Sequence, residues 1–330
     1  MIGSANGRPI SITGLGCYVP DRVMTNAELA ELVDTSDEWI TERTGIKERR
    51  FASDEQAMSD LALPAARDAL AQAGVEPKDL DLVIVATVTP DMMFPTTSAL
   101  VADALGADDA AAYDLLAGCT GFMYAVAQAY GMLAGGLADR ALVVGGDVLS
   151  KILDWTDRST LVLFGDGAGA VVLERVDRGG FLGFELGADG GGGEHLWLPG
   201  SGSRRFEDPD SFVKMNGREV FKFATRVLVT SAEKLLEQCG LTIDDVDVYV
   251  PHQANVRIID HAVRKLGVRE ERVVVNVDRY GNTSSGSIPL ALADAAADGR
   301  LKPGEIVLMT GMGAGLTWGS ALIEWTEEMV

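Results

Sequence analysis

The chain has 330 residues, enough for one large domain or two medium-sized ones, and 47% of them are hydrophobic, which excludes a disordered chain. The 49 acidic residues outnumber the 28 basic ones. The resulting net charge of −21 argues against nucleic acid and against an anionic membrane surface as partners.

The cysteines and histidines favour a reducing compartment and no metal site. The three cysteines lie far apart and form no CxxC pair, so we expect no disulfide framework, no zinc site and a cytoplasmic location. The three histidines lack the spacing of metal ligands. The N-terminus shows no signal-peptide pattern. The uncharged run at residues 307–323 is short for a membrane span, and its glycines are typical of two strands joined by a tight turn.

The sequence repeats itself with an offset of 166 residues. ALAQAGVEPKDLDLVIV, which begins at Ala69, corresponds to LLEQCGLTIDDVDVYVP, which begins at Leu235. The same offset places ALVVG (residues 141–145) on VLMTG (residues 307–311). Because one offset holds over widely separated segments, it indicates a duplication.

Each half is predicted to contain a helix, an acidic turn, a buried strand, and then another helix and strand. Uninterrupted apolar runs such as LVIVATV are typical of strands buried on both faces, and their alternation with helices favours parallel sheets. We therefore predict an α/β fold, a five-layer α/β/α/β/α sandwich of two duplicated halves, residues 1–174 and 175–330. The junction at residues 174–180 is short, so the halves should pack as one unit.

Cys119 lies in AGCTGF, directly ahead of an apolar segment that has no continuous polar face. A helix of this kind is buried, and its N-terminus carries unsatisfied N–H groups and a partial positive charge. A thiol there is expected to lose its proton more readily than a free cysteine, although the segment alone also allows a small core residue. The repeat relates Cys119 to Ser285, so two helix starts should meet near a pseudo-twofold axis.

The second half offers two polar candidates, each in front of a predicted helix. A strand should end at Pro251, and His252 follows in a loop before the predicted helix 256–266, where sheets of this class bind ligands. Asn282 lies in a Gly-Asn turn, and its amide can donate hydrogen bonds. The alternatives are a capping or core histidine and a structural turn with an N-cap.

Two glycine-rich segments are candidate binding loops, and the first of them follows a predicted strand. GMGAGLTWGS (residues 311–320) exposes backbone N–H groups, which suits an oxyanion hole. GDGAGAVVL (residues 165–173) has the spacing GxGxG instead of GxGxxG and leads into a β-rich run, so we reject dinucleotide binding.

Together, AGCTGF, PHQAN, GNTS and GxGAGLTWGS, in this order and spacing, resemble the thiolase superfamily and, within it, the β-ketoacyl-acyl-carrier-protein synthase III family. The resemblance covers almost the whole chain, including DTSDEWITERTGIKERR and FPTTSALVADALG. It implies a thiolase-like fold for the five-layer sandwich. It also implies an acyltransferase that performs a decarboxylating Claisen condensation of a CoA-linked acyl primer with malonyl-acyl carrier protein. The reaction passes through an acyl-cysteine intermediate and initiates fatty-acid synthesis. The resemblance implies no cofactor, because CoA thioester and phosphopantetheine are substrates. The implied partners are acyl-CoA, acyl carrier protein and a second copy in a homodimer.

The resemblance also implies a role for individual residues. The catalytic set would be Cys119, His252 and Asn282, with the N–H groups of Cys119 and Ala314 as the oxyanion hole. CoA would be bound by Trp39 and Arg158, which stack on the adenine, and by Arg43, Phe221 and Asn255. For Trp39, a helix-packing aromatic is the alternative. Phe94, which would cross to the partner, and Met312, where the family often has an aromatic residue, would border the acyl pocket.

A basic helix face has an independent sequence signal. In the predicted helix 256–266, Arg257 and Arg264 share a face opposite the apolar stripe, Lys265 lies beside them, and Lys222 extends the patch. On a chain of net charge −21, this cluster would attract an acidic carrier protein. A merely solvated face is the alternative.

Other functions fit the same fold. The realistic alternative is a specialised thiolase-superfamily acyltransferase or a polyketide-type condensing enzyme. A degradative thiolase would need a second cysteine in the C-terminal glycine loop, which residues 312–315 lack. A non-catalytic carrier-binding module should lack at least one catalytic residue. Acetyl, branched and longer primers all fit the sequence.

Overall fold

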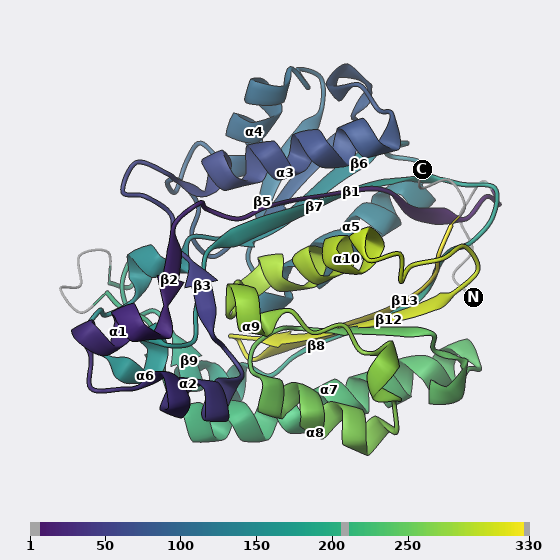
Figure 1. Cartoon of the computed structure of the whole chain (residues 1–330). Helices are drawn as coiled ribbons and strands as arrows, with labels where there is room; N and C mark the ends of the chain where they lie inside the picture. The colour runs from purple at the N-terminus through teal and green to yellow at the C-terminus, as the bar shows by residue number, and fades with distance from the viewer. Residues whose placement is uncertain (1–6, 206–210, 327–330) are drawn as a thin grey trace.

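The computed structural model describes residues 7–205 and 211–326, and its main sheets are stacked between layers of helices (Figure 1). The strands are β1 (Ile10–Tyr18), β2 (Val23–Thr25), β3 (Glu48–Arg50), β4 (Leu82–Ala86), β5 (Ala111–Leu115), β6 (Ala141–Asp147), β7 (Gly167–Arg175), β8 (Gly180–Ala188), β9 (Leu196–Trp197), β10 (Lys214–Met215), β11 (Val248–Pro251), β12 (Ile306–Gly313) and β13 (Thr317–Glu324). The helices are α1 (Asn26–Leu32), α2 (Asp37–Thr44), α3 (Met58–Ala73), α4 (Thr97–Leu105), α5 (Gly121–Ala134), α6 (Arg158–Leu161), α7 (Gly217–Cys239), α8 (Val256–Leu266), α9 (Val277–Tyr280) and α10 (Ser287–Ala297).

The two main sheets and their helices form five layers, as predicted. A five-stranded sheet has the order β1-β7-β6-β4-β5, and a four-stranded sheet has the order β11-β12-β13-β8. Helices α3 and α4 cover the outer face of the first sheet, α7 and α8 cover the outer face of the second, and α5 and α10 lie between the sheets (Figure 1). The predicted boundary between residues 174 and 175 remains a proposal.

The predicted parallel pairing is correct for only part of each sheet. β4 pairs in parallel with β5 and β6, and β11 pairs in parallel with β12, but β1, β7 and β6 are antiparallel neighbours, as are β12, β13 and β8. The physical reason is clearest at β12 and β13, because a short turn joins them and can only reverse the chain. This hairpin is the strand-turn-strand that the sequence predicts for residues 307–323.

The offset of the sequence repeat is also present in the structure. β4 and β11, and likewise α5 and α10, start 166 residues apart. Each of these helices is preceded by a single 3-10 turn, η2 (Gly118–Thr120) and η7 (Ser284–Gly286). The first residue of each turn has a positive φ, 56° at Gly118 and 53° at Ser284. The two turns contact each other, so the helix starts meet at the centre of the molecule.

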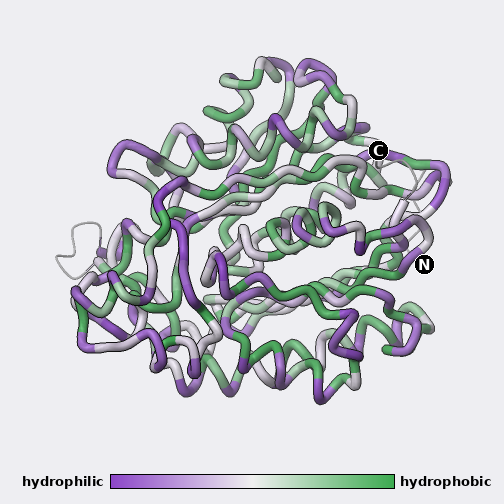
Figure 2. The backbone as a smooth tube through the Cα atoms, viewed as in Figure 1, coloured by the Kyte–Doolittle hydropathy of each residue, from purple (hydrophilic) through white to green (hydrophobic). Residues whose placement is uncertain are grey.

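The core lies mainly along the strands and on both sides of each sheet. Hydrophobic residues gather along the strands of the two sheets (Figure 2). Between the sheets, Phe122, Met123 and Val126 of α5 pack with Ile288 and Leu292 of α10. The predicted burial of the helix after Cys119 is therefore correct. Among the described helices, no segment is both long and apolar enough to cross a membrane.

Candidate active site

Cys119 lies in the turn η2, between the end of β5 and the start of α5. The preceding residue has a positive φ of 56°, and a Cβ atom at Gly118 would stand only 2.8 Å from the backbone nitrogen of Ala314. Glycine therefore allows this turn to approach the β12–β13 hairpin. The N–H groups of Cys119 and Ala314 both lower the pKa of the Cys119 thiol, because they favour a negative charge on the sulfur.

The expectation that the pKa of the Cys119 thiol is lowered is wrong. Burial raises the pKa of the Cys119 thiol to about 11, although the Ser284 hydroxyl and the two backbone N–H groups lower it, and the nearby Asp147 carboxylate adds to the increase. The desolvation of a buried thiolate thus outweighs the donors at the helix start. In the free protein at neutral pH the sulfur is a thiol.

His252 follows β11 directly, as predicted, and its ring is buried. Its backbone N–H donates to the carbonyl of Thr310 at 2.7 Å, which ties the residue to β12. The ring Nδ1 lies 2.5 Å from the hydroxyl oxygen of Ser287. Nε2 is buried and has no hydrogen-bond partner among the described residues. Burial lowers the pKa of His252 to about 3, so the imidazole is neutral at neutral pH.

Asn282 is held by its backbone and by one end of its amide. Its N–H donates to the carbonyl of Leu163 at 2.9 Å, and its carbonyl accepts the N–H of Gly165 at 3.0 Å. The side-chain Oδ1 accepts the N–H of Ser284 at 2.9 Å. The NH2 end of the amide is consequently the end that a ligand can meet.

Cys119, His252 and Asn282 line one cavity of about 280 Å³. The cavity runs between the two halves, because the cysteine comes from the first half and the other two side chains come from the second. Met312, Phe221, Asn255, Trp39 and Arg43 also line it. The arrangement combines a sulfur nucleophile, two backbone donors and two neutral side-chain groups, and these are the parts needed for acyl transfer and for stabilising an oxyanion.

Two arginine side chains lie over the ring of Trp39. The guanidinium carbons of Arg43 and Arg158 each lie 4.8 Å from the ring centroid. Arg158 also donates to the carbonyl of Asp34 at 2.6 Å, and it does not line the cavity. Because Arg158 already rests on the indole, an adenine could enter between them only if the guanidinium moved.

The remaining predicted residues fall into three places. Met312 is buried against the cavity, whereas Phe94 is 83% exposed and does not line it. Asn255 caps α8, because its Oδ1 accepts the N–H of Arg257 at 2.9 Å, while its Nδ2 donates to the carbonyl of Arg43 at 3.1 Å. Exposed basic residues are found on α7 and α8: Lys222, Arg257, Arg264 and Lys265.

Sequence reasoning missed three residues that hold the site together. The Ser284 hydroxyl lowers the pKa of the Cys119 thiol, and the Ser287 hydroxyl lies against His252. Thr317 accepts a hydrogen bond from Thr120 at 2.6 Å and donates to the carbonyl of Ala117 at 3.0 Å, which joins η2 to the hairpin. For Ser284 and Ser287, the only sequence signal was the serine-rich run GNTSSGS, which is more readily interpreted as a turn.

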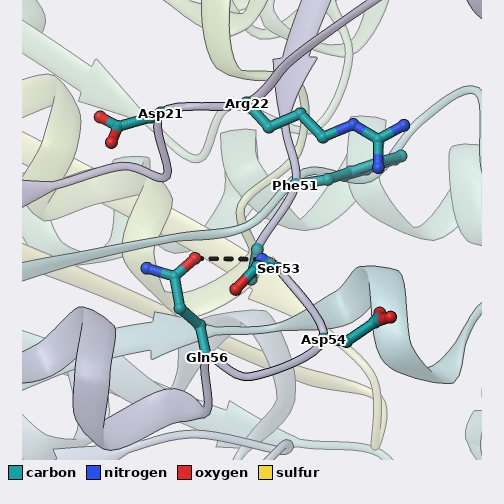
Figure 3. Close-up of a pocket in the computed structure, with 7 residues that line it drawn as sticks. Asp21, Arg22, Phe51, Ser53, Asp54 and Gln56 are labelled. Carbon is teal, nitrogen blue, oxygen red and sulfur yellow. Dashed lines mark hydrogen bonds between the residues drawn. The ribbon is translucent and has the colours of Figure 1, made fainter.

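A second hollow, of about 540 Å³, is formed by Asp21, Arg22, Phe51, Ala52, Ser53, Asp54 and Gln56 (Figure 3). The side chain of Gln56 accepts the N–H of Ser53 at 3.0 Å, so the polar groups of this loop are partly engaged with each other. Its lining contains neither a cysteine nor a histidine. Within residues 7–205 and 211–326, no group of three or more Cys, His, Asp or Glu side chains is arranged to hold a metal ion.

The fold and the cavity at Cys119 define a thiolase-like protein. Comparison with known proteins identifies the family within this class. Family models match at residues 113–190, described as 3-oxoacyl-[acyl-carrier-protein] synthase III, and at residues 236–325, described as its C-terminal part. The chain is 55% identical over 325 residues to the β-ketoacyl-[acyl-carrier-protein] synthase III of Symbiobacterium thermophilum, with 96% of this chain and 98% of the relative covered. The chain therefore belongs to the β-ketoacyl-acyl-carrier-protein synthase III family.

Solved structures agree with this assignment. The crystal structure of β-ketoacyl-[acyl-carrier-protein] synthase III from Thermus thermophilus has a TM-score of 0.91 and 52% identity, covering 96% of this chain and 99% of that one. The priming β-ketosynthase of the R1128 polyketide biosynthetic pathway also has a TM-score of 0.91, at 38% identity, with coverage of 99% and 98%. The thiolase-like fold is thus confirmed.

Proposed function

We propose that the chain catalyses the initiating condensation of fatty-acid synthesis, in which a CoA-linked acyl primer is joined to malonyl-acyl carrier protein. Membership of the synthase III family supports the reaction class. The single observation that carries the proposal for this chain is the cavity in which Cys119, His252 and Asn282 meet.

In the first half-reaction, the Cys119 sulfur attacks the thioester of acyl-CoA. CoA leaves with the proton that the thiol has lost, and an acyl-cysteine remains. The negative oxygen of the intermediate would be held by the N–H groups of Cys119 and Ala314, which already favour negative charge at this sulfur. The same donors and the Ser284 hydroxyl stabilise the thiolate as it forms.

In the second half-reaction, malonyl-acyl carrier protein loses CO₂, and its enolate attacks the acyl-cysteine to give a 3-oxoacyl product and free Cys119. The enolate oxygen needs hydrogen-bond donors. The NH2 of Asn282 and a proton on His252 Nε2 would supply them, because neither group has another partner among the described residues. Both side chains are neutral, so they stabilise charge that develops only during the reaction.

The CoA substrate would lie along the cavity toward Trp39. Arg43 and Arg158 rest on this ring and provide positive charge for the phosphates and a planar surface for the adenine. Phe221 and Asn255, which also line the cavity, would border the path of the pantetheine arm. No cofactor is required, because the reactive groups belong to the substrates and to the cysteine.

The carrier protein would dock on the exposed basic residues of α7 and α8. Both helices border the cavity, because Phe221 of α7 and Ile258 of α8 line it. Their exposed basic residues are Lys222, Arg257, Arg264 and Lys265. On a chain of net charge −21, a cluster of cations is the surface that attracts an acidic partner.

We further propose a homodimer formed at β5. This strand lies at the edge of the five-stranded sheet. Leu116, which follows β5 directly, is 75% exposed. Phe94 is 83% exposed and lies three residues before Thr97, whose N–H donates to Asp114 of β5 at 2.8 Å. An unpaired strand edge and exposed apolar side chains of this kind favour pairing with a second copy. A second copy would cover both, and Phe94 would then reach the acyl pocket of the partner.

A cytoplasmic location remains a proposal. It is supported by the cysteines, since Cys17, Cys119 and Cys239 are all free thiols.

The priming polyketide synthase among the similar structures gives a second candidate: the same condensation could start a polyketide. One experiment tests both. Intact-protein mass spectrometry after incubation with a panel of acyl-CoAs would show a mass gain that maps to Cys119 and would identify the preferred primer. Malonyl-acyl carrier protein from fatty-acid or polyketide synthesis, added next, should discharge the acyl group as a 3-oxoacyl product. An unmodified Cys119, or an acyl-enzyme that malonyl-acyl carrier protein never discharges, would refute the proposed reaction.

A further inference from the structure

Ser287 contacts His252 on the ring nitrogen that the proposed reaction does not use. It is the first residue of α10, and its side chain is buried. Its Oγ lies 2.5 Å from His252 Nδ1, whereas Nε2 has no partner among the described residues. The imidazole is therefore fixed through one nitrogen, and the other nitrogen is available to a ligand.

The neighbours of Ser287 determine which ring nitrogen carries the proton. Apart from Nδ1, the polar contact of this hydroxyl among the described residues is the backbone N–H of Gln253, at 3.4 Å, and this group can only donate. If Nδ1 carried the proton and donated it to Oγ, the hydroxyl proton would have no acceptor in a buried place, which is costly. If Nε2 carries the proton, Ser287 donates to Nδ1 and accepts from Gln253, and every group is satisfied.

We propose that Ser287 is a positioning residue that holds neutral His252 in the Nε2–H tautomer, so that the ring can donate a hydrogen bond into the cavity. The inference rests on the proposed function for its catalytic meaning. Burial supports it, because the pKa of His252 is lowered to about 3 and a neutral ring has only one N–H to donate.

The tautomer matters for only one half-reaction. In the opposite tautomer the lone pair of Nε2 would face the enolate oxygen, and two acceptors would repel each other. The acylation of Cys119 relies instead on the N–H groups of Cys119 and Ala314, which do not depend on the ring. A change at Ser287 should therefore impair condensation and spare acyl transfer.

The first test reads the proton directly. The chain has only three histidines, so 15N-histidine labelling and long-range 15N–1H correlation spectra can assign each ring, with a His252→Gln sample to identify the signals of His252. We expect the Nε2–H form in the free wild-type protein and a weakened or mixed form in Ser287→Ala. A wild-type ring protonated at Nδ1 would overturn the inference.

The second test separates the half-reactions. Ser287→Ala should lower the condensation rate by about tenfold, the upper range for one hydrogen bond, with the acylation rate unchanged. Ser287→Thr keeps the hydroxyl and should restore condensation. Ser231→Ala is the matched control, because Ser231 is also buried but its hydroxyl donates to Glu185, and neither residue lines the cavity. It should keep the wild-type ratio of the two rates.

A folded Ser287→Ala protein with wild-type condensation would contradict the inference, as would equal loss in both half-reactions. Failure of the proposed function would look different. In that case the wild type itself would not condense with malonyl-acyl carrier protein, while the tautomer measured in the free protein would still test Ser287.

Discussion

The amide of Asn282 is oriented by the backbone of Ser284, whose N–H donates to Asn282 Oδ1 at 2.9 Å. Ser284 adopts a positive φ of 53°, which is uncommon for a residue with a side chain. The turn thereby points this N–H at the carbonyl end of the amide, and the NH2 end remains available to a ligand. The donor is thus set in place before any ligand binds.

Replacing Asn282 should separate the two half-reactions. Asn282→Ala removes the donor, and Asn282→Asp keeps the shape while turning the donor into an acceptor. Each should reduce condensation by about 10²- to 10³-fold, the usual effect of losing one oxyanion donor. Acyl transfer to Cys119 should change little. The measurement is the rate of each half-reaction by mass spectrometry, and equal losses in both would refute the assigned role.

The alkylation of Cys119 should depend steeply on pH. Because burial raises the pKa of its thiol to about 11, only a small fraction is thiolate at neutral pH. The rate with iodoacetamide should rise by about tenfold per pH unit from neutral pH upward, since the thiolate is the reactive form. Peptide mapping separates Cys119 from the exposed Cys17. A plateau reached below pH 8 would show an acidic thiol and contradict this structure-based expectation.

Charge reversal on α8 should slow the encounter with the carrier protein. The double change Arg257→Glu and Arg264→Glu should lower the association rate with malonyl-acyl carrier protein by about tenfold at low salt, and less at high salt. Transfer from acyl-CoA should be retained. The matched control is Arg67→Glu with Lys78→Glu, an equal change of charge on exposed residues of the first half. If the control slowed association as much, the effect would be one of net charge and the docking surface would be wrong.

Phe94→Glu should disrupt the proposed dimer. An exposed phenylalanine that packs against a second copy loses that contact when it becomes charged. Light scattering should then report a mass near the 35.0 kDa of one chain, where the wild type gives twice that value. Leu32→Glu, a change at another exposed apolar residue on α1, should leave the dimer intact. A monomeric wild type would refute the homodimer.

The ends of helices and strands are predictable from the sequence where a capping residue, a glycine or a proline marks them. α8 spans Val256–Leu266 as expected, because Asn255 caps its start and Gly267, with φ 78°, ends it. β11 ends at Pro251 for a similar reason, since proline cannot continue donating to the sheet. The five layers follow from the repeat, because each half must bury its sheet on both faces.

Properties that depend on neighbours distant in the sequence were not predictable. The pKa of Cys119 depends on how completely the second half covers it, and no pattern around residue 119 encodes that coverage. The same is true of the contact between Arg158 and Trp39, and of the antiparallel pairing of β1 with β7, whose partners lie far apart in the chain. Sequence patterns report which face of an element is buried, but not what covers it.

The contact between η2 and η7 at the centre of the molecule has a consequence for the order in which activity and secondary structure are lost on heating. Cys119 belongs to the first half, whereas His252 and Asn282 belong to the second. A partial separation of the halves between α5 and α10 would therefore move these side chains apart before either sheet unfolds. Loss of turnover should therefore precede the loss of circular dichroism on heating, and the reactive centre would serve as an early reporter of damage to the whole architecture.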